Sequence, residues 1–91
     1  MSEEFNVIAK IRIMPEGLEV DLTKIEEKLR KEIGTDARLN SIETKPVAFG
    51  LNSLVATILL NDSKGGLEEL QERIQGFEGV SQVEVTDIGR L

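Results

Sequence analysis

The chain has 91 residues, of which 40% are hydrophobic and 31% are charged, and its formal net charge is −6. This length and composition predict a single globular domain over residues 1–91, and the acidic balance with only three aromatic residues argues against a nucleic-acid partner. The sequence has no His, Cys, Tyr or Trp, so we expect no enzymatic activity, no cofactor and no resident metal.

The first segment, residues 5–14, alternates apolar and polar side chains with a period of two, which predicts a half-buried strand. Its apolar face contains Phe5, Val7, Ala9, Ile11 and Ile13. Pro15 and Gly17 follow directly and are typical of a turn that ends the strand.

Residues 22–33 repeat their apolar side chains with the spacing of a helix. The stripe consists of Leu22, Ile25, Leu29 and Ile33. Asp21 is well placed to cap the start of this helix, and Gly34 to end it in a left-handed conformation.

Two strands are predicted in the middle of the chain. The first, over residues 37–42, is weakly patterned, and we expect Ala37, Leu39 and Ser41 on one face and Arg38, Asn40 and Ile42 on the other. Pro46 cannot belong to a central strand, so we expect this strand at a sheet edge. Residues 51–61 form the most apolar stretch of the chain, which favours a strand in the middle of the sheet.

The last third of the chain repeats the strand-helix-strand plan. Residues 62–66 have the composition of a turn, and apolar residues over 67–74 then recur with helical spacing. Alternation over residues 82–86 predicts a last strand. Residues 88–91 follow it with no further element to cover them.

The predicted order is strand, helix, strand, strand, helix, strand. Gaps of about twenty residues between the first and second strands, and between the third and fourth, fit helical crossovers. Right-handed crossovers of this kind define an α+β ferredoxin-like βαββαβ sandwich. We therefore expect four antiparallel strands in the spatial order 4-1-3-2, with both helices on one face.

Two segments have no evident role in this fold. Phe49 lies in the connection over residues 45–51, where it either packs beneath the loop or serves as an exposed anchor for a protein partner. The C-terminal residues either fray, as most chain termini do, or insert into a partner's site. Insertion is possible because Gly89 permits a bend, Arg90 carries a fixed charge and Leu91 supplies an apolar tip. For strands of about eight residues, the two segments would be separated by roughly 25–30 Å.

Proteins with this fold also include enzymes and ligand-sensing domains. An acylphosphatase-like enzyme needs an arginine after the first strand to hold phosphate, and residues 14–20 contain none. The sequence is also compatible with a ligand-sensing regulatory domain, because such a domain requires only backbone groups at the start of a helix.

Targeting signals are not evident in the sequence. Met1–Glu4 lacks the basic start of a signal peptide, and no apolar run approaches about 18 residues. We expect a cytoplasmic protein without membrane contact.

Several motifs resemble the archaeal elongation factor 1-beta family. The Pro46–Leu51 run and the Val80–Leu91 ending are the most specific, and Lys10–Pro15 and Val20–Leu22 match as well. The resemblance covers essentially the whole chain and extends to the catalytic domain of the eukaryotic counterpart. It implies a ferredoxin-like guanine-nucleotide exchange factor that promotes GDP release from elongation factor 1-alpha during polypeptide elongation.

The resemblance also implies roles for five residues. Phe49, with Gly50 beside it, matches the family's hairpin phenylalanine, which contacts the second domain of the GTPase. Ile88, Arg90 and Leu91 match the C-terminal contact, and Arg90 stands where eukaryotic relatives carry a lysine that enters the magnesium site. Arginine keeps that charge in a planar, bulkier group. The implied partner is the GTPase in its GDP-bound and nucleotide-free forms, and we expect the free factor to be a monomer.

Overall fold

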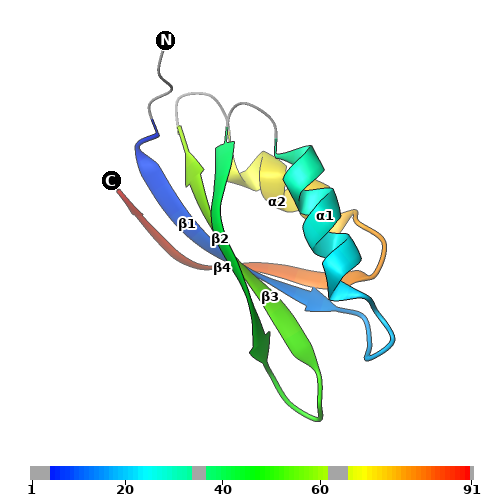
Figure 1. The fold of residues 1–91 in the computed structure, drawn as a ribbon. Helices are drawn as coiled ribbons and strands as arrows, with labels where there is room; N and C mark the ends of the chain where they lie inside the picture. Colours follow the sequence, from blue (N-terminus) through cyan, green and yellow to red (C-terminus); the bar gives the residue numbers. More distant parts are fainter. Residues whose placement is uncertain (1–4, 34–36, 62–65, 91) are drawn as a thin grey trace.

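The computed structural model describes residues 5–33, 37–61 and 66–90, and there it contains the predicted strands and helices in the predicted order (Figure 1). In chain order these elements are β1 (Val7–Pro15), α1 (Leu22–Glu32), β2 (Ala37–Pro46), β3 (Asn52–Leu60), α2 (Leu67–Gln75) and β4 (Val80–Arg90). Most of the turn predicted over residues 62–66 lies outside the described residues, as does Gly34.

The sheet has the predicted topology. Its four strands lie in the order β2-β3-β1-β4, and every neighbouring pair is antiparallel. Both helices cover the same face of the sheet (Figure 1). β3 lies between β2 and β1, as its apolar composition predicted, and β2 and β4 form the two edges.

The hydrophobic core lies between the sheet and the two helices. Alternate side chains of the central strands and the apolar stripes of the helices form one cluster, whose main members are Ala9, Ile11, Ile13, Ile25, Leu29, Leu54, Ala56, Ile58, Leu70 and Ile74. Each fully buried Leu or Ile contributes about 1.5–3 kcal/mol relative to exposure. The core therefore fixes the sheet that carries the connecting loops.

Helix α1 begins as the sequence predicts. The carboxylate of Asp21 accepts a hydrogen bond from the backbone N–H of Thr23 at 3.0 Å, which satisfies one of the unpaired donors of the first turn. Ile25 and Leu29 are buried, and the helix ends with Ile33 as its C-cap.

The predicted faces of β2 are wrong beyond Leu39. Leu39 pairs with Ile58, but the register then shifts, and Ile42 pairs with the buried Ala56. Asn40 is thus an extra residue in the ladder, as in a β-bulge. The side chains that follow it therefore point to the opposite face of the sheet from the one that simple alternation predicts. Ile42 consequently packs against the core and Ser41 is exposed, the reverse of the expectation.

Strand β4 is longer than the alternation over residues 82–86 indicated. A second bulge, at Thr86, shifts the register so that Ile88 pairs with Ala9 and Arg90 with Val7. Gly89 continues the ladder and does not adopt a positive φ. The C-terminal segment up to Arg90 is therefore a paired edge strand, not the uncovered tail that the sequence analysis expected.

The side chain of Gln75, at the end of α2, is bound to the outer edge of β4. Its amide Nε2 donates to the carbonyl of Ser81 at 3.0 Å, and its Oε1 accepts from the backbone N–H of Val83 at 3.2 Å. Since β1 is the neighbour on the other side of β4, the amide pairs with backbone groups that would otherwise face solvent. Gln75 thereby fixes the start of β4 to α2.

Candidate interaction surfaces at the two ends of the sheet

The connection between β2 and β3 is a tight turn over residues 48–51. The N–H of Leu51 donates to the carbonyl of Ala48 at 2.9 Å, and the N–H of Val47 donates to the carbonyl of Leu51 at 2.8 Å. Phe49 and Gly50 have φ values of 54° and 79°. Two successive left-handed residues closed by such a bond define a type I′ turn, the hairpin turn whose twist matches the strands.

Phe49 is an unusual occupant of this turn. A left-handed φ costs a residue with a Cβ about 1–2 kcal/mol, and type I′ turns prefer Asn, Asp or Gly there. Its side chain is also 99% exposed, so the ring does not recover the cost by packing. Exposure excludes the alternative in which Phe49 packs beneath the loop.

Two further apolar side chains are exposed close to this turn. Val47 is 44% exposed, and Leu18, in the loop between β1 and α1, is 69% exposed. A Cβ atom at Gly50 would lie 3.9 Å from Leu18 Cδ2, which places the two loops in contact. We refer to Leu18, Val47 and Phe49 as the hairpin patch.

Leu18 was missed by the sequence analysis. The available signal was an apolar residue inside a predicted turn, outside the periodic pattern of the strand before it and the helix after it. An apolar residue in a loop can be either buried or exposed, so the sequence alone does not decide between the two.

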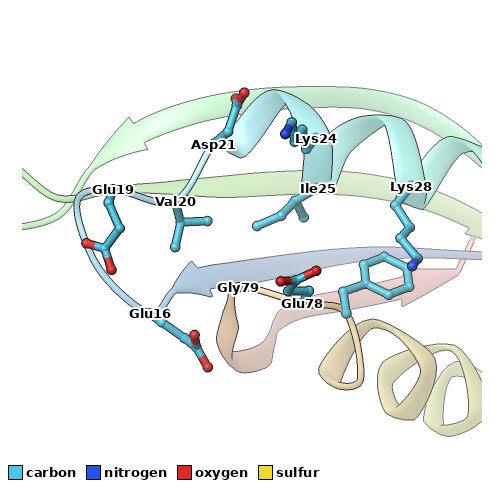
Figure 2. Close-up of a pocket in the computed structure, with 10 residues that line it drawn as sticks. Glu16, Glu19, Val20, Asp21, Lys24, Ile25, Lys28, Glu78 and Gly79 are labelled. Carbon is cyan, nitrogen blue, oxygen red and sulfur yellow. The ribbon is translucent and has the colours of Figure 1, made fainter.

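A groove of about 500 Å³ opens at the same end of the sheet, between the β1–α1 loop and the α2–β4 turn (Figure 2). The ammonium of Lys28 lies 5.6 Å from the centre of the Phe77 ring, and Asp21 caps α1. The other acidic residues of the lining are Glu16, Glu19 and Glu78. Among the described residues, no group of three or more His, Cys, Asp or Glu side chains is arranged to hold a metal ion.

The last residues of β4 form the second candidate surface. Ile88 is 58% exposed and Arg90 is exposed as well, while Leu91 lies outside the described residues. A shallow groove of about 380 Å³ runs beside them, between β1, β4 and the start of α2. Its wall is mainly apolar and includes Val7, Leu60, Leu67 and Ile88, with Arg90 at its margin.

The two candidate surfaces lie at opposite ends of the sheet, as expected (Figure 1). The turn precedes Asn52, the first residue of β3, whereas Arg90 is paired with Val7, which pairs with Leu60 at the other end of β3. The nine residues of β3 span roughly 30 Å at about 3.3 Å each. Phe49 and Arg90 therefore cannot share one small-molecule site.

Comparison with known proteins places the chain in a family. The model of the EF-1 guanine nucleotide exchange domain matches residues 8–91. Elongation factor 1-beta of Methanothermobacter thermautotrophicus is 40% identical over 86 residues, which cover 94% of this chain and 97% of the relative. The elongation factor 1-beta of Sulfolobus acidocaldarius is 37% identical over 87 residues, with 94% and 97% covered.

The fold also resembles solved structures of other proteins. The ACT domain from the GTP pyrophosphokinase of Chlorobium tepidum superposes with a TM-score of 0.63 over 88% of this chain and 85% of that domain. The two sequences are 22% identical, so this likeness concerns the fold alone. It gives no support to the ligand-sensing alternative.

A small α+β sandwich that exposes apolar side chains at two distant ends has the surface features of proteins that bind another macromolecule. The chain is a member of the EF-1 guanine nucleotide exchange domain family. The expected function, guanine-nucleotide exchange on elongation factor 1-alpha in polypeptide elongation, is confirmed at the level of this family. Neither described helix is long and apolar enough to cross a membrane.

Proposed function

We propose that this chain promotes GDP release by contacting elongation factor 1-alpha at both ends of its sheet at the same time. One observation carries the proposal: the large apolar side chains that the described residues expose lie at these two ends, with Leu18, Val47 and Phe49 at one and Ile88 at the other. A rigid sheet roughly 30 Å long between them suits a partner that is itself built from more than one domain.

Phe49 is the anchor of the complex in this proposal. A fully exposed ring on a short, hydrogen-bonded turn loses little conformational freedom on binding, and one buried aromatic group can dominate the energy of an interface. Gly50 maintains the turn, because its φ of 79° is unfavourable for any side chain. The strain at Phe49 is consistent with a residue whose conformation serves binding.

Arg90 supplies the step that weakens nucleotide binding. The magnesium ion of a GTPase neutralises the phosphates of its nucleotide, so a guanidinium brought close to that position repels the ion and loosens the GDP. Linkage requires the reverse effect as well: GDP must weaken binding of the factor by the same ratio. Ile88 and Leu91 would hold the C-terminal strand against the GTP-binding domain.

No covalent step is needed for this activity, so the factor acts without being an enzyme and without a cofactor of its own. Residues 1–91 would act as one exchange domain, monomeric when free, in the cytoplasm where elongation takes place. Its partner would be the GTPase in the GDP-bound and nucleotide-free forms, with no direct contact to nucleic acid or membrane.

Stopped-flow release of a fluorescent GDP from the purified GTPase tests the proposal directly. The wild-type factor should accelerate release, and it should bind the nucleotide-free GTPase more tightly than the GDP-bound form. Equal affinity for the two forms would overturn the proposal, because a factor without preference cannot shift the equilibrium.

A further inference from the structure

Leu18 is presented outward by a loop that is fixed at both of its ends. The N–H of Glu16 donates to the carbonyl of Gly79 at 2.8 Å, and the N–H of Val20 donates to the carbonyl of Gly17 at 3.3 Å, which closes a turn around Leu18. Val20 packs against the core, whereas Leu18 is 69% exposed. The outward position of Leu18 is therefore set by the backbone of the loop.

One exposed leucine on a protein surface is ordinary, but the hairpin patch is not a single residue. Leu18 lies next to the turn that carries Phe49, as its 3.9 Å approach to the Cβ position of Gly50 shows, and Val47 lies just before the same turn. Two loops far apart in the sequence thus contribute to one apolar surface. Clustered exposed apolar groups of this kind mark interaction sites.

We infer that the hairpin patch is one continuous docking surface for the GTPase, and that Leu18 is a contact residue beside Phe49. This inference rests on the proposed function, in which Phe49 is the anchor at this end. The occupant is the same GTPase, because a surface continuous with the Phe49 contact must meet whatever buries that ring. Leu18 widens the contact to a second loop and thereby fixes the direction from which the partner approaches.

The surroundings of the patch indicate the chemistry of the partner surface. Glu16 and Glu19 flank Leu18 in the chain, and Glu78 lines the same groove (Figure 2). Within the described residues these three carboxylates form no ion pair. The same lining also contains Lys24 and Lys28, and the ammonium of Lys28 lies over the Phe77 ring, so carboxylates outnumber ammonium groups there. An apolar patch bordered by carboxylates fits a partner surface that is apolar in the centre and carries Lys or Arg at its rim.

The first test compares L18S with L18M by calorimetric titration against the nucleotide-free GTPase. We expect L18S to weaken binding about five- to tenfold and L18M to retain most of the affinity. Thermal unfolding of both variants should match the wild type, because the side chain is largely exposed. Unchanged affinity of L18S, with F49A impaired, would overturn the inference and leave the proposed function standing; if neither variant weakened binding, both would fail.

The second test addresses the acidic rim with the double variant E16Q/E19Q. We expect a slower association rate in low salt, and a difference from the wild type that disappears at about 0.5 M salt, where exposed charges are screened. The matched control is E27Q/E32Q, which removes two exposed charges from α1 outside the groove lining. An equal effect of the two double variants would show that only net charge matters and would overturn the role of the rim.

Discussion

The two ends of the sheet present their exposed groups in different ways. At the turn, two backbone hydrogen bonds hold Phe49 in a left-handed conformation that a phenylalanine adopts only at a cost. At the other end, Ile88 and Arg90 belong to the last residues of an edge strand that is paired with β1 on one side. A strained turn provides a fixed anchor, whereas the end of an edge strand opens at a low free-energy cost. In the proposed function, the first end would therefore supply affinity and the second the exchange step.

The largest expected effect is that of F49A on complex formation. Removing the exposed ring should weaken binding of the nucleotide-free GTPase by about 2–4 kcal/mol, as for an interface hot spot. The free energy of unfolding should change by less than about 0.5 kcal/mol, because the ring makes little contact within the domain. Calorimetry and urea unfolding measure the two quantities. If F49A lost much of its stability but kept its affinity for the GTPase, Phe49 would be a structural residue and not a binding residue.

The next effect is that of R90A on the rate of GDP release. We expect release to slow about tenfold or more, equivalent to about 1.4 kcal/mol, with a smaller loss of affinity. R90K is the matched control and should retain most of the activity, because it keeps the positive charge. Stopped-flow fluorescence gives the rates. An unchanged rate of GDP release with R90A would show that Arg90 does not promote exchange and would contradict separate roles for the two ends.

The variant F49N separates the effect of Phe49 on the stability of the domain from its effect on binding to the GTPase. Asparagine tolerates a left-handed φ and gives the turn the Asn-Gly pair that type I′ turns prefer, so unfolding should become about 1 kcal/mol less favourable. Binding to the GTPase should fall as it does for F49A. The control is A48N, since Ala48 does not have a positive φ and should gain nothing. If F49N were no more stable than the wild type, the left-handed conformation would not be a stored cost.

The smallest expected effect is that of I88A. Ile88 is 58% exposed and would lie at the margin of the proposed interface, so its truncation should cost about 0.5–1 kcal/mol of affinity, below the effect of F49A. Calorimetric titration of I88A against the nucleotide-free GTPase measures this loss of affinity. A loss larger than that of F49A would invert the ranking of the two ends.

The sequence predicted the elements whose patterns extend over several residues. The alternation over residues 5–14, the stripe from Leu22 to Ile33 and the apolar run before Asn61 each indicated the observed element, because burial acts on every repeat. Ile42 was assigned to the wrong face, since a bulge at Asn40 inserts one residue without a distinctive residue type. Local pattern is thus a reliable guide to elements and a poor one to register.

The candidate surfaces were predicted less completely. The motif around Phe49 indicated a binding residue, but its exposure depends on the turn type, which short sequences determine only weakly. Leu18 joins the patch because its side chain approaches Gly50, about thirty residues further along the chain, and no local pattern records such an approach. The extension of β4 to Arg90 was missed for the same reason, because it depends on pairing with β1.

The attachment of Gln75 to β4 has a consequence for the behaviour of the protein at high concentration. An unpaired strand edge is a template on which a further chain can add, and this is a common route to aggregation. Here a side-chain amide occupies the carbonyl of Ser81 and the N–H of Val83, the groups that an added strand would need. Gln75 thus blocks the addition of a further strand at the start of β4 and leaves the far end of the strand, with Ile88 and Arg90, unblocked by this side chain.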